Sequence, residues 1–217
     1  MGYHIITALD IGSSFVKTLV AREDKKDNKI EVLGKGIVAC GGLRKGEILH
    51  LEEVTSAITE SVNLAQEEAG QKVKSCVCNI NGPHLFSTLS QGLVSVSRAD
   101  QKISPDDVAR ALRQAENITL PSNKEVLESF PIDFIVDGEK GIKQPQGLKG
   151  NRLEVRTLLL CIFSPVLENL TKAVLNAGLK IDDIIPSAIA AARSCLTNKE
   201  KELGVLLVDI GSATTGM

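Results

Sequence analysis

Aromatic residues are scarce in this sequence. Five phenylalanines, one tyrosine and no tryptophan make up 3% of its 217 residues. Proteins that bind single-stranded nucleic acids stack bases on aromatic side chains, and nucleic-acid surfaces usually carry an excess of positive charge. Here the formal net charge is −2 and the sequence pI is about 6.0. Both features argue against a nucleic-acid partner.

Long apolar runs are also missing. No segment approaches the roughly 20 apolar residues that a membrane-spanning helix needs, and the N-terminus lacks the pattern of a signal peptide. The three histidines are too scattered to suggest a metal site. The cysteines are odd in number, stand in apolar contexts and form no C-x-x-C pair. They are Cys40, Cys76, Cys78, Cys161 and Cys195. We expect reduced core cysteines in a cytosolic protein.

Residues 4–20 are the most informative stretch. An apolar run ends at Asp10, a Gly-Ser-Ser segment follows at 12–14, and a second run then begins. This second run alternates Phe15, Lys17 and Leu19 with Val16, Thr18 and Val20. Short apolar runs around a glycine-containing turn predict a buried β-hairpin.

Asp10 is the unusual residue of this hairpin. Burying an unpaired carboxylate at the end of a strand destabilises a fold by several kcal/mol, so we expect Asp10 to hold a ligand. Hydrated Mg²⁺ beside phosphate groups is the obvious candidate. Gly12 allows the backbone to approach a ligand closely, and successive N–H groups in such a turn can bind an anion. Lys17 could lie in this cleft or be solvated.

The same pattern returns at residues 204–215. There, an apolar run that we predict to be a strand ends in Asp209-Ile210-Gly211, and small hydroxyl residues follow. A single copy would favour an ordinary turn. Two copies in matching contexts predict two pseudo-equivalent lobes that grip one phosphate chain.

Periodicity predicts the order β-β-β-α-β for residues 1–83. After the hairpin we expect a charged turn over 21–29, a third strand from Ile30 to about Cys40, and a solvated basic loop at 41–46. A helix over 51–69 ends at Gly70, and a buried strand covers 73–80.

Asn81-Gly82-Pro83 marks a break, and residues 84–163 follow as a small α+β unit inserted into the first domain. The unit starts with alternating residues at 93–97. Ser104 caps a helix with Pro105 at its first position that runs to about Ile118. We then expect a strand over 126–136, a loop over 137–151 and a strand over 153–163.

The α/β pattern resumes after the insert. We expect a helix over 164–177 that ends at Gly178, a strand over 179–185, and an alanine-rich helix opened by Pro186. So many alanines allow close approach of another helix or of a nucleotide. From Leu203 the chain leads into the second Asp-Ile-Gly strand.

The chain resembles the actin/Hsp70/sugar-kinase ATPase superfamily in three segments: the phosphate loops at 10–17 and 209–215 and the connecting helix at Pro186. Within it, the chain resembles the FtsA family of bacterial cell-division proteins, over nearly its whole length. The motifs behind the second resemblance are Gly42-Leu43-Arg44-Lys45-Gly46, Phe134-Ile135-Val136-Asp137-Gly138, Gly141-Ile142-Lys143, Gly150-Asn151-Arg152-Leu153-Glu154-Val155 and Glu202-Leu203-Gly204-Val205.

The resemblance implies an α/β fold, an actin-like ATPase lobe in which helices flank a ribonuclease-H-like sheet. Residues 1–83 and 164–202 would form subdomain 1A. Residues 84–163 would form the inserted subdomain 1C, an SHS2 domain. Residues 203–217 would begin subdomain 2A of a second lobe that is truncated here. The parts that in the family bind the purine, FtsZ and the lipid surface would also be absent from this sequence.

The resemblance also implies a site for ATP and Mg²⁺. Asp10, the one candidate catalytic residue, and Asp209 would hold Mg²⁺ through water. The phosphate contacts would come from Asp10, Gly12, Ser13, Ser14 and Lys17 in one loop and from Asp209, Gly211, Ser212, Thr214 and Thr215 in the other. The second loop departs from the superfamily pattern, because Ser212 and Ala213 stand where glycine is usual and Gly216 stands where an acidic residue is usual. We expect weak ATPase activity at most in a complete protein and none from this chain alone.

The family tethers FtsZ filaments to the inner face of the cytoplasmic membrane, recruits other divisome proteins and self-associates. Membrane contact would require a C-terminal helix that this sequence does not contain. Two alternatives stay open. One is a non-catalytic interaction module that acts through the 1C-like unit, and the other is a small kinase of the same superfamily, for which no catalytic base beyond Asp10 can be named.

Overall fold

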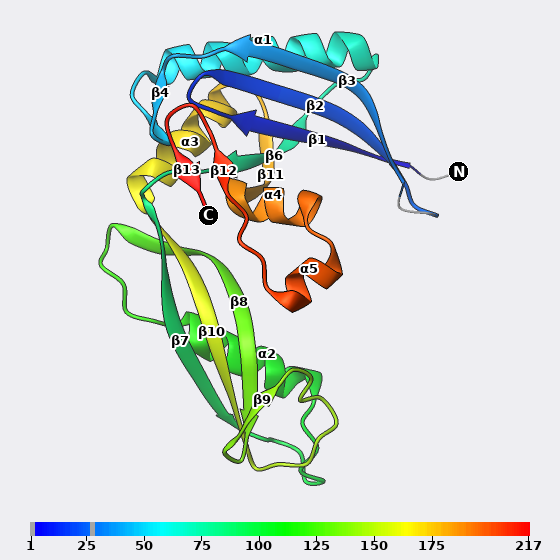
Figure 1. Ribbon diagram of the computed structural model, residues 1–217, viewed down its shortest axis with the longest axis vertical. Helices are drawn as coiled ribbons and strands as arrows, with labels where there is room; N and C mark the ends of the chain where they lie inside the picture. The colour runs from blue at the N-terminus through cyan, green and yellow to red at the C-terminus, as the bar shows by residue number, and fades with distance from the viewer. Residues whose placement is uncertain (1–2, 27–28) are drawn as a thin grey trace. The chain divides into compact units, whose positions relative to one another are not determined.

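The computed structural model describes residues 3–26 and 29–217 and contains two compact units (Figure 1). The first unit comprises the chain up to residue 84 together with residues 165–217, and the second comprises residues 85–164. The subdomain names 1A and 1C, and the assignment of residues 203–217 to a second lobe, stay predictions.

A five-stranded sheet in the order β11-β6-β1-β2-β3 forms the centre of the first unit. Its strands are β1 (Tyr3–Ile11), β2 (Phe15–Asp24), β3 (Ile30–Ala39), β6 (Ser75–Ile80) and β11 (Lys180–Pro186). The first three are antiparallel neighbours, whereas β6 runs parallel to β1 and β11 parallel to β6. The predicted hairpin is confirmed. The turn predicted over 21–29 starts later, because β2 continues to Asp24, and residues 27–28 lie outside the described residues.

Helix α1 (Leu51–Ala69) packs against β2 and β3 on one face of this sheet. Val16, Thr18 and Val20 are buried beneath it, and the Thr18 and Ser61 hydroxyls hydrogen-bond over 2.8 Å. The contact is close because a Cβ on Gly36 would lie 1.9 Å from the Ser61 carbonyl oxygen. The helix ends at Gly70, as predicted.

The remaining elements of the first unit are β4 (Leu43–Arg44), β5 (Glu47–Ile48), α3 (Ser164–Asn176), α4 (Ser187–Cys195), α5 (Asn198–Leu203), β12 (Asp209–Ile210) and β13 (Thr215–Gly216). Sequence patterns miss α5, a six-residue helix whose first turn is closed by a capping box between Thr197 and Glu200. Among the helices of residues 3–26 and 29–217, none is both long and apolar enough to cross a membrane.

The prediction of a strand before the second Asp-Ile-Gly motif is wrong. Residues 204–208 are not in a strand, and Leu206 is 73% exposed. In the described part of the chain the short β12 pairs with β13 and with no other strand. An apolar run becomes a buried strand only where neighbouring strands take up its backbone hydrogen bonds and other elements cover its side chains.

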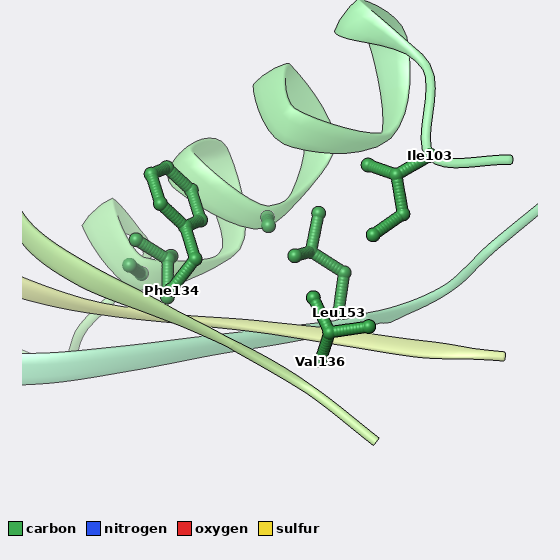
Figure 2. Packing of buried hydrophobic residues seen from close by; sticks show 7 residues of the cluster. Ile103, Phe134, Val136 and Leu153 are labelled. Atoms are coloured by element: carbon green, nitrogen blue, oxygen red, sulfur yellow. The ribbon is translucent and has the colours of Figure 1, made fainter. Parts of the chain in front are cut away.

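The second unit is an antiparallel four-stranded sheet in the order β7-β10-β8-β9, with helix α2 on one face. Its elements are β7 (Leu85–Ser95), α2 (Pro105–Glu116), β8 (Lys124–Val136), β9 (Glu139–Ile142) and β10 (Arg152–Phe163). Figure 2 shows Ile103, Phe134, Val136 and Leu153 in the core between sheet and helix. The prediction of a loop over all of 137–151 is wrong, because this segment contains β9. A tight turn at Asp137 and Gly138 joins β9 to β8.

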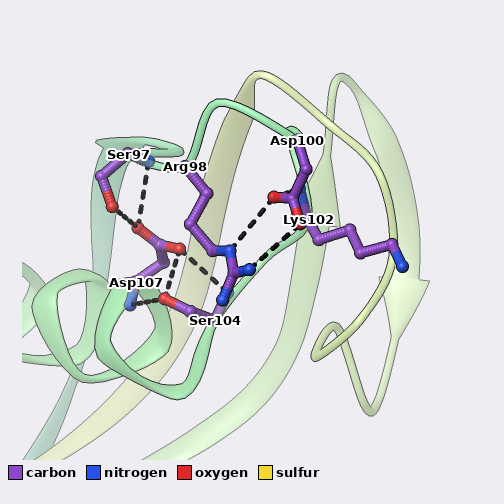
Figure 3. Close-up of polar contacts among 6 residues, drawn as sticks. All are labelled: Ser97, Arg98, Asp100, Lys102, Ser104 and Asp107. Atoms are coloured by element: carbon purple, nitrogen blue, oxygen red, sulfur yellow. Dashed lines mark hydrogen bonds and ion pairs between the residues drawn. The ribbon is translucent and has the colours of Figure 1, made fainter.

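The predicted cap of α2 is confirmed and extended. Ser104 and Asp107 form a reciprocal capping box, and Asp107 also accepts hydrogen bonds from the amide and hydroxyl of Ser97 (Figure 3). Arg110 donates to the same carboxylate. Burial raises the pKa of Asp107, but the hydrogen bonds from Ser104, Arg110 and Ser97 outweigh it and hold the pKa well below its usual range.

Candidate functional site

A pocket of about 360 Å³ lies where the two Asp-Ile-Gly hairpins of the first unit meet. Its lining contains all but one of the residues predicted from sequence to bind phosphate: Asp10, Gly12, Ser13, Ser14, Lys17, Asp209, Gly211, Ser212 and Thr214. The exception is Thr215, an exposed residue on β13 opposite Ile210. The fold thus gathers two segments nearly two hundred residues apart around one cavity.

The two hairpins turn in the same way. In the first, the Gly12 amide donates to the Phe15 carbonyl over 3.0 Å; in the second, the Gly211 amide donates to the Thr214 carbonyl over 2.9 Å. Each aspartate therefore stands two residues before the glycine of an equivalent turn. The hairpin registers place Lys17 opposite Asp10 and Gly216 opposite Asp209. The first hairpin therefore supplies a cation that the second lacks.

The carboxylate of Asp10 already has partners. Lys17 donates from Nζ to Oδ2 over 2.9 Å, and Asn79 donates from Nδ2 to Oδ1 over 2.6 Å. The Asp10 side chain is also 48% exposed. The premise that Asp10 would be unpaired is therefore wrong, because the hairpin register brings a lysine beside it; that Asp10 binds a ligand stays a prediction. A hydrated cation at Asp10 would compete with Lys17 for the carboxylate, and displacement of Lys17 would free its ammonium group for an anion.

Asn79 is a central residue that sequence analysis misses. Its carbonyl oxygen accepts from the Ile11 amide over 2.7 Å, and its Nδ2 donates to Ser187 Oγ over 3.0 Å as well as to Asp10. One side chain therefore links the ends of β1 and β6 to the start of α4. The available signal was a polar amide among the apolar residues of 76–80.

A second asparagine connects β6 to the C-terminal hairpin. Asn81 donates from Nδ2 to Thr214 Oγ1 over 3.1 Å. The wall beside it comes from the β4–β5 turn, where a Cβ on Gly46 would lie 1.9 Å from the Asn81 carbonyl oxygen. Leu43 of the same segment is buried and lines the pocket. The interpretation of residues 41–46 as a solvated loop is therefore wrong for Leu43 and Gly46.

These groups have the chemistry of an anion site with acidic residues at its border. Lys17, turn glycines and small hydroxyl side chains suit the oxygens of a phosphate chain. Asp10 and Asp209 suit a hydrated divalent cation beside it, because Mg²⁺ usually keeps several waters and uses one or two carboxylates. No group of three or more histidine, cysteine or acidic side chains in the described ranges 3–26 and 29–217 could hold a metal directly.

Comparison with known proteins agrees with this architecture. The model of the family described as "SHS2 domain inserted in FTSA" matches residues 82–161. Proteins named cell division protein FtsA are similar along 97% of the chain, at 37% identity in Pseudomonas aeruginosa, 32% in Bacillus subtilis and 30% in Escherichia coli. The aligned part is 50%, 48% and 49% of those relatives. The chain therefore spans about half the length of the curated relatives it matches.

A solved structure supports the fold. A chain of a PilM–PilN type IV pilus biogenesis complex superposes with a TM-score of 0.57 at 16% identity. The superposition covers 87% of this chain and 49% of that one. The predicted actin-like ATPase fold is confirmed by this likeness. The match to the inserted SHS2 domain and the relatives that align along nearly the whole sequence show that the chain belongs to the FtsA family.

Proposed function

We propose that this chain is the phosphate-binding part of an FtsA-like cell-division protein. The observation that carries the proposal is that both Asp-Ile-Gly hairpins line one pocket. Equivalent turns on two sides of one cavity suit a linear chain of phosphates better than a single anion. The proposed ligand is ATP with Mg²⁺.

The residues that would hold this ligand divide into two groups. Gly12, Ser13 and Ser14 would contact phosphate oxygens from one side, and Gly211, Ser212 and Thr214 from the other. Lys17 would leave Asp10 to neutralise phosphate charge, while Asp10 and Asp209 would hold the hydration shell of Mg²⁺. Thr215 would contribute only after the C-terminal hairpin rearranges. Bound Mg²⁺ would neutralise phosphate charge, which supplies much of the chemistry of phosphoryl transfer.

The cellular role is proposed from the family. Relatives of this chain are named cell division protein FtsA, and we propose that a protein with this chain links FtsZ filaments to the inner face of the cytoplasmic membrane. It would recruit other divisome proteins and self-associate. The contacts with FtsZ and lipid would lie outside residues 1–217, so the chain should stay in the supernatant when FtsZ filaments are sedimented. Co-sedimentation with the filaments would assign that contact to these residues instead.

Calorimetric titration with MgATP and with ATP plus EDTA tests the proposed ligand. We expect weak, Mg²⁺-dependent binding and essentially no phosphate release, because a nucleotide site needs walls that enclose most of the ligand. Lys17→Ala should weaken binding further. Lys35→Ala is the matched control, because Lys35 is an exposed lysine opposite Leu19 on the same face of the same sheet. Equal loss in both variants would mean that general charge, and not Lys17, attracts the ligand.

A further inference from the structure

Strand β7 is an edge of the second unit that is unprotected over most of its length. In Figure 1 it is the outermost strand of this sheet, and within residues 3–26 and 29–217 β10 is the one strand that pairs with it. Its 11 residues, LFSTLSQGLVS, include no charge and no proline, and its register with β10 is unbroken from Leu85 to Ser95. Natural edge strands usually carry charges, prolines or bulges that prevent pairing with another chain.

The other side of the same sheet shows such protection. Strand β8 carries Lys124, Glu125, Glu128 and Pro131, and its register with β10 shifts at two places. The charged four-residue strand β9 covers its end. One edge is therefore guarded against pairing and the other is suited to it.

The backbone direction of β7 follows from the hydrogen bonds near its end. The Val96 amide donates to the Asn151 carbonyl, at the start of β10, whereas the Ser95 carbonyl accepts from Arg110 of α2. The Ser97 amide likewise donates to Asp107 of α2. Because these directions alternate along a strand, the odd-numbered residues direct their N–H and C=O groups away from β10. Side chains of α2 cap this edge at 95 and 97.

Leu89, Gln91 and Leu93 continue the same outward row before the cap begins. Their side chains lie on the sheet face opposite α2, where Leu89 is 72% and Leu93 50% exposed. The sequence around Gln91 reads nearly the same in both directions. Leu89 mirrors Leu93, and Ser87 mirrors Ser95.

We propose that β7 pairs antiparallel with β7 of a second copy of this chain, about a two-fold axis at Gln91. In this register Gln91 faces Gln91 of the second copy and Leu89 faces Leu93 of the second copy. The outward groups of 89, 91 and 93 would form about six backbone hydrogen bonds, two for each facing pair. A strand without charge meets its copy without repulsion, and a two-fold contact requires such a self-complementary surface.

The inference deepens the self-association part of the proposed function and is independent of the phosphate pocket. Sedimentation velocity first establishes whether the full 217-residue chain associates, and we expect a dimer that dissociates on dilution. A chain that stays monomeric at every concentration up to its solubility limit overturns both the self-association and this surface. If the chain forms a dimer, the cross-linking test below decides whether β7 is the contact surface. Its failure would overturn this surface but not self-association.

Cysteine cross-linking reads the register directly. Cys195→Ser removes the exposed native thiol, because the other four cysteines are buried. In this background, Gln91→Cys should cross-link to itself under mild oxidation, since facing residues lie about 5.5 Å apart between Cα atoms. Leu89→Cys alone should not, because its copies would be about 14 Å apart along the strands. A mixture of Leu89→Cys and Leu93→Cys chains should cross-link. A dimer with no bond at 91, or with a bond in Leu89→Cys alone, overturns the proposal.

A charge substitution gives a non-covalent test. Gln91→Glu places like charges opposite each other at the axis, and we expect the dimer dissociation constant to rise about tenfold. Gln114→Glu is the matched control, because Gln114 is exposed on α2, away from the edge. It should leave the constant unchanged, and circular dichroism should be the same for both variants. Equal effects of the two variants, or no effect of Gln91→Glu, contradict pairing through β7.

Discussion

Asn79 and Asp10 are joined by a hydrogen bond of 2.6 Å from Nδ2 to Oδ1 at the ends of two neighbouring parallel strands. The same asparagine accepts from the Ile11 amide, so it fixes both the carboxylate and the backbone next to it. Lys17 holds the other carboxylate oxygen. Asn79 therefore orients Asp10 from inside the fold, while the contact on the solvent side is one that a ligand can replace.

Asn79→Ala should destabilise the first unit by about 1–3 kcal/mol. The substitution removes the half-buried hydrogen bonds that Asn79 makes with the Ile11 amide and with the Asp10 carboxylate. The matched control is Asn63→Ala, since Asn63 is exposed on α1 and contacts Gln66. Urea unfolding followed by circular dichroism measures both variants. Equal stability of the two would mean that the link through Asn79 contributes nothing.

The stability of the second unit should depend on pH through Asp107. Its pKa lies below the usual range in the folded state, so the charged carboxylate stabilises the fold above about pH 4 and this stabilisation is lost as pH falls toward the folded-state pKa. Asp107→Asn should cost about 1–3 kcal/mol at pH 7, and this cost should begin to shrink only below about pH 4 and keep shrinking as the pH falls toward the folded-state pKa.

Asp106→Asn is the control for that experiment, because it removes the same charge at an exposed position of the same helix turn. Urea unfolding between pH 2 and 7 provides the comparison. If the two variants keep a constant difference in stability over this range, the Asp107 network has no pH-dependent role.

Gly36→Ala should unfold or severely destabilise the first unit, by about 3 kcal/mol or more. The new methyl group would meet the backbone of α1 at Ser61, which cannot move without separating helix and sheet. Gly41→Ala is the milder control, because its methyl group would meet only the Glu53 carboxylate at 3.0 Å. Thermal unfolding distinguishes them. Similar melting temperatures would show that α1 shifts easily on the sheet.

Cys195 should be the fast-reacting thiol of the native chain. The other four cysteines are buried, and desolvation raises the pKa of Cys76 to about 11 and that of Cys78 to about 12. At pH 8 the thiolate fraction of Cys76 is then about one in a thousand. A thiol-reactive dye should label one cysteine in native buffer and five in denaturant. Rapid labelling of the Cys195→Ser variant would contradict this burial.

Much of the fold follows from local sequence patterns. Val16, Thr18 and Val20 alternate with more polar or exposed positions, and Gly70 stops a helix of regular apolar spacing, so the hairpin and α1 were predictable. Strand β9 was not, because Glu139–Ile142 is short and polar and exists only through its register with β8. The apolar residues 204–208 mislead for the opposite reason, since composition alone does not supply a neighbouring strand.

The candidate site was predictable where its residues are close in sequence. Asp10 and Lys17 face each other because of the hairpin register, so their ion pair could have been inferred from the length of the turn. Asn79 reaches Asp10, and Ser187 reaches Asn79, through parallel strands and a helix that follow long crossovers. No spacing in the sequence encodes that contact, and it required the three-dimensional arrangement.

The central claim is that both hairpins contact the phosphates of one ligand. Backbone NMR spectra recorded during titration with MgATP test it most directly, with separate titrations by ATP without Mg²⁺ and by magnesium pyrophosphate. We predict that the amide signals of Gly12, Ser13, Gly211 and Ser212 shift along one binding curve with a dissociation constant on the order of 1 mM. The amide signal of Gly147 in the second unit should stay in place. Shifts confined to one hairpin, or two curves with different constants, would contradict a shared site.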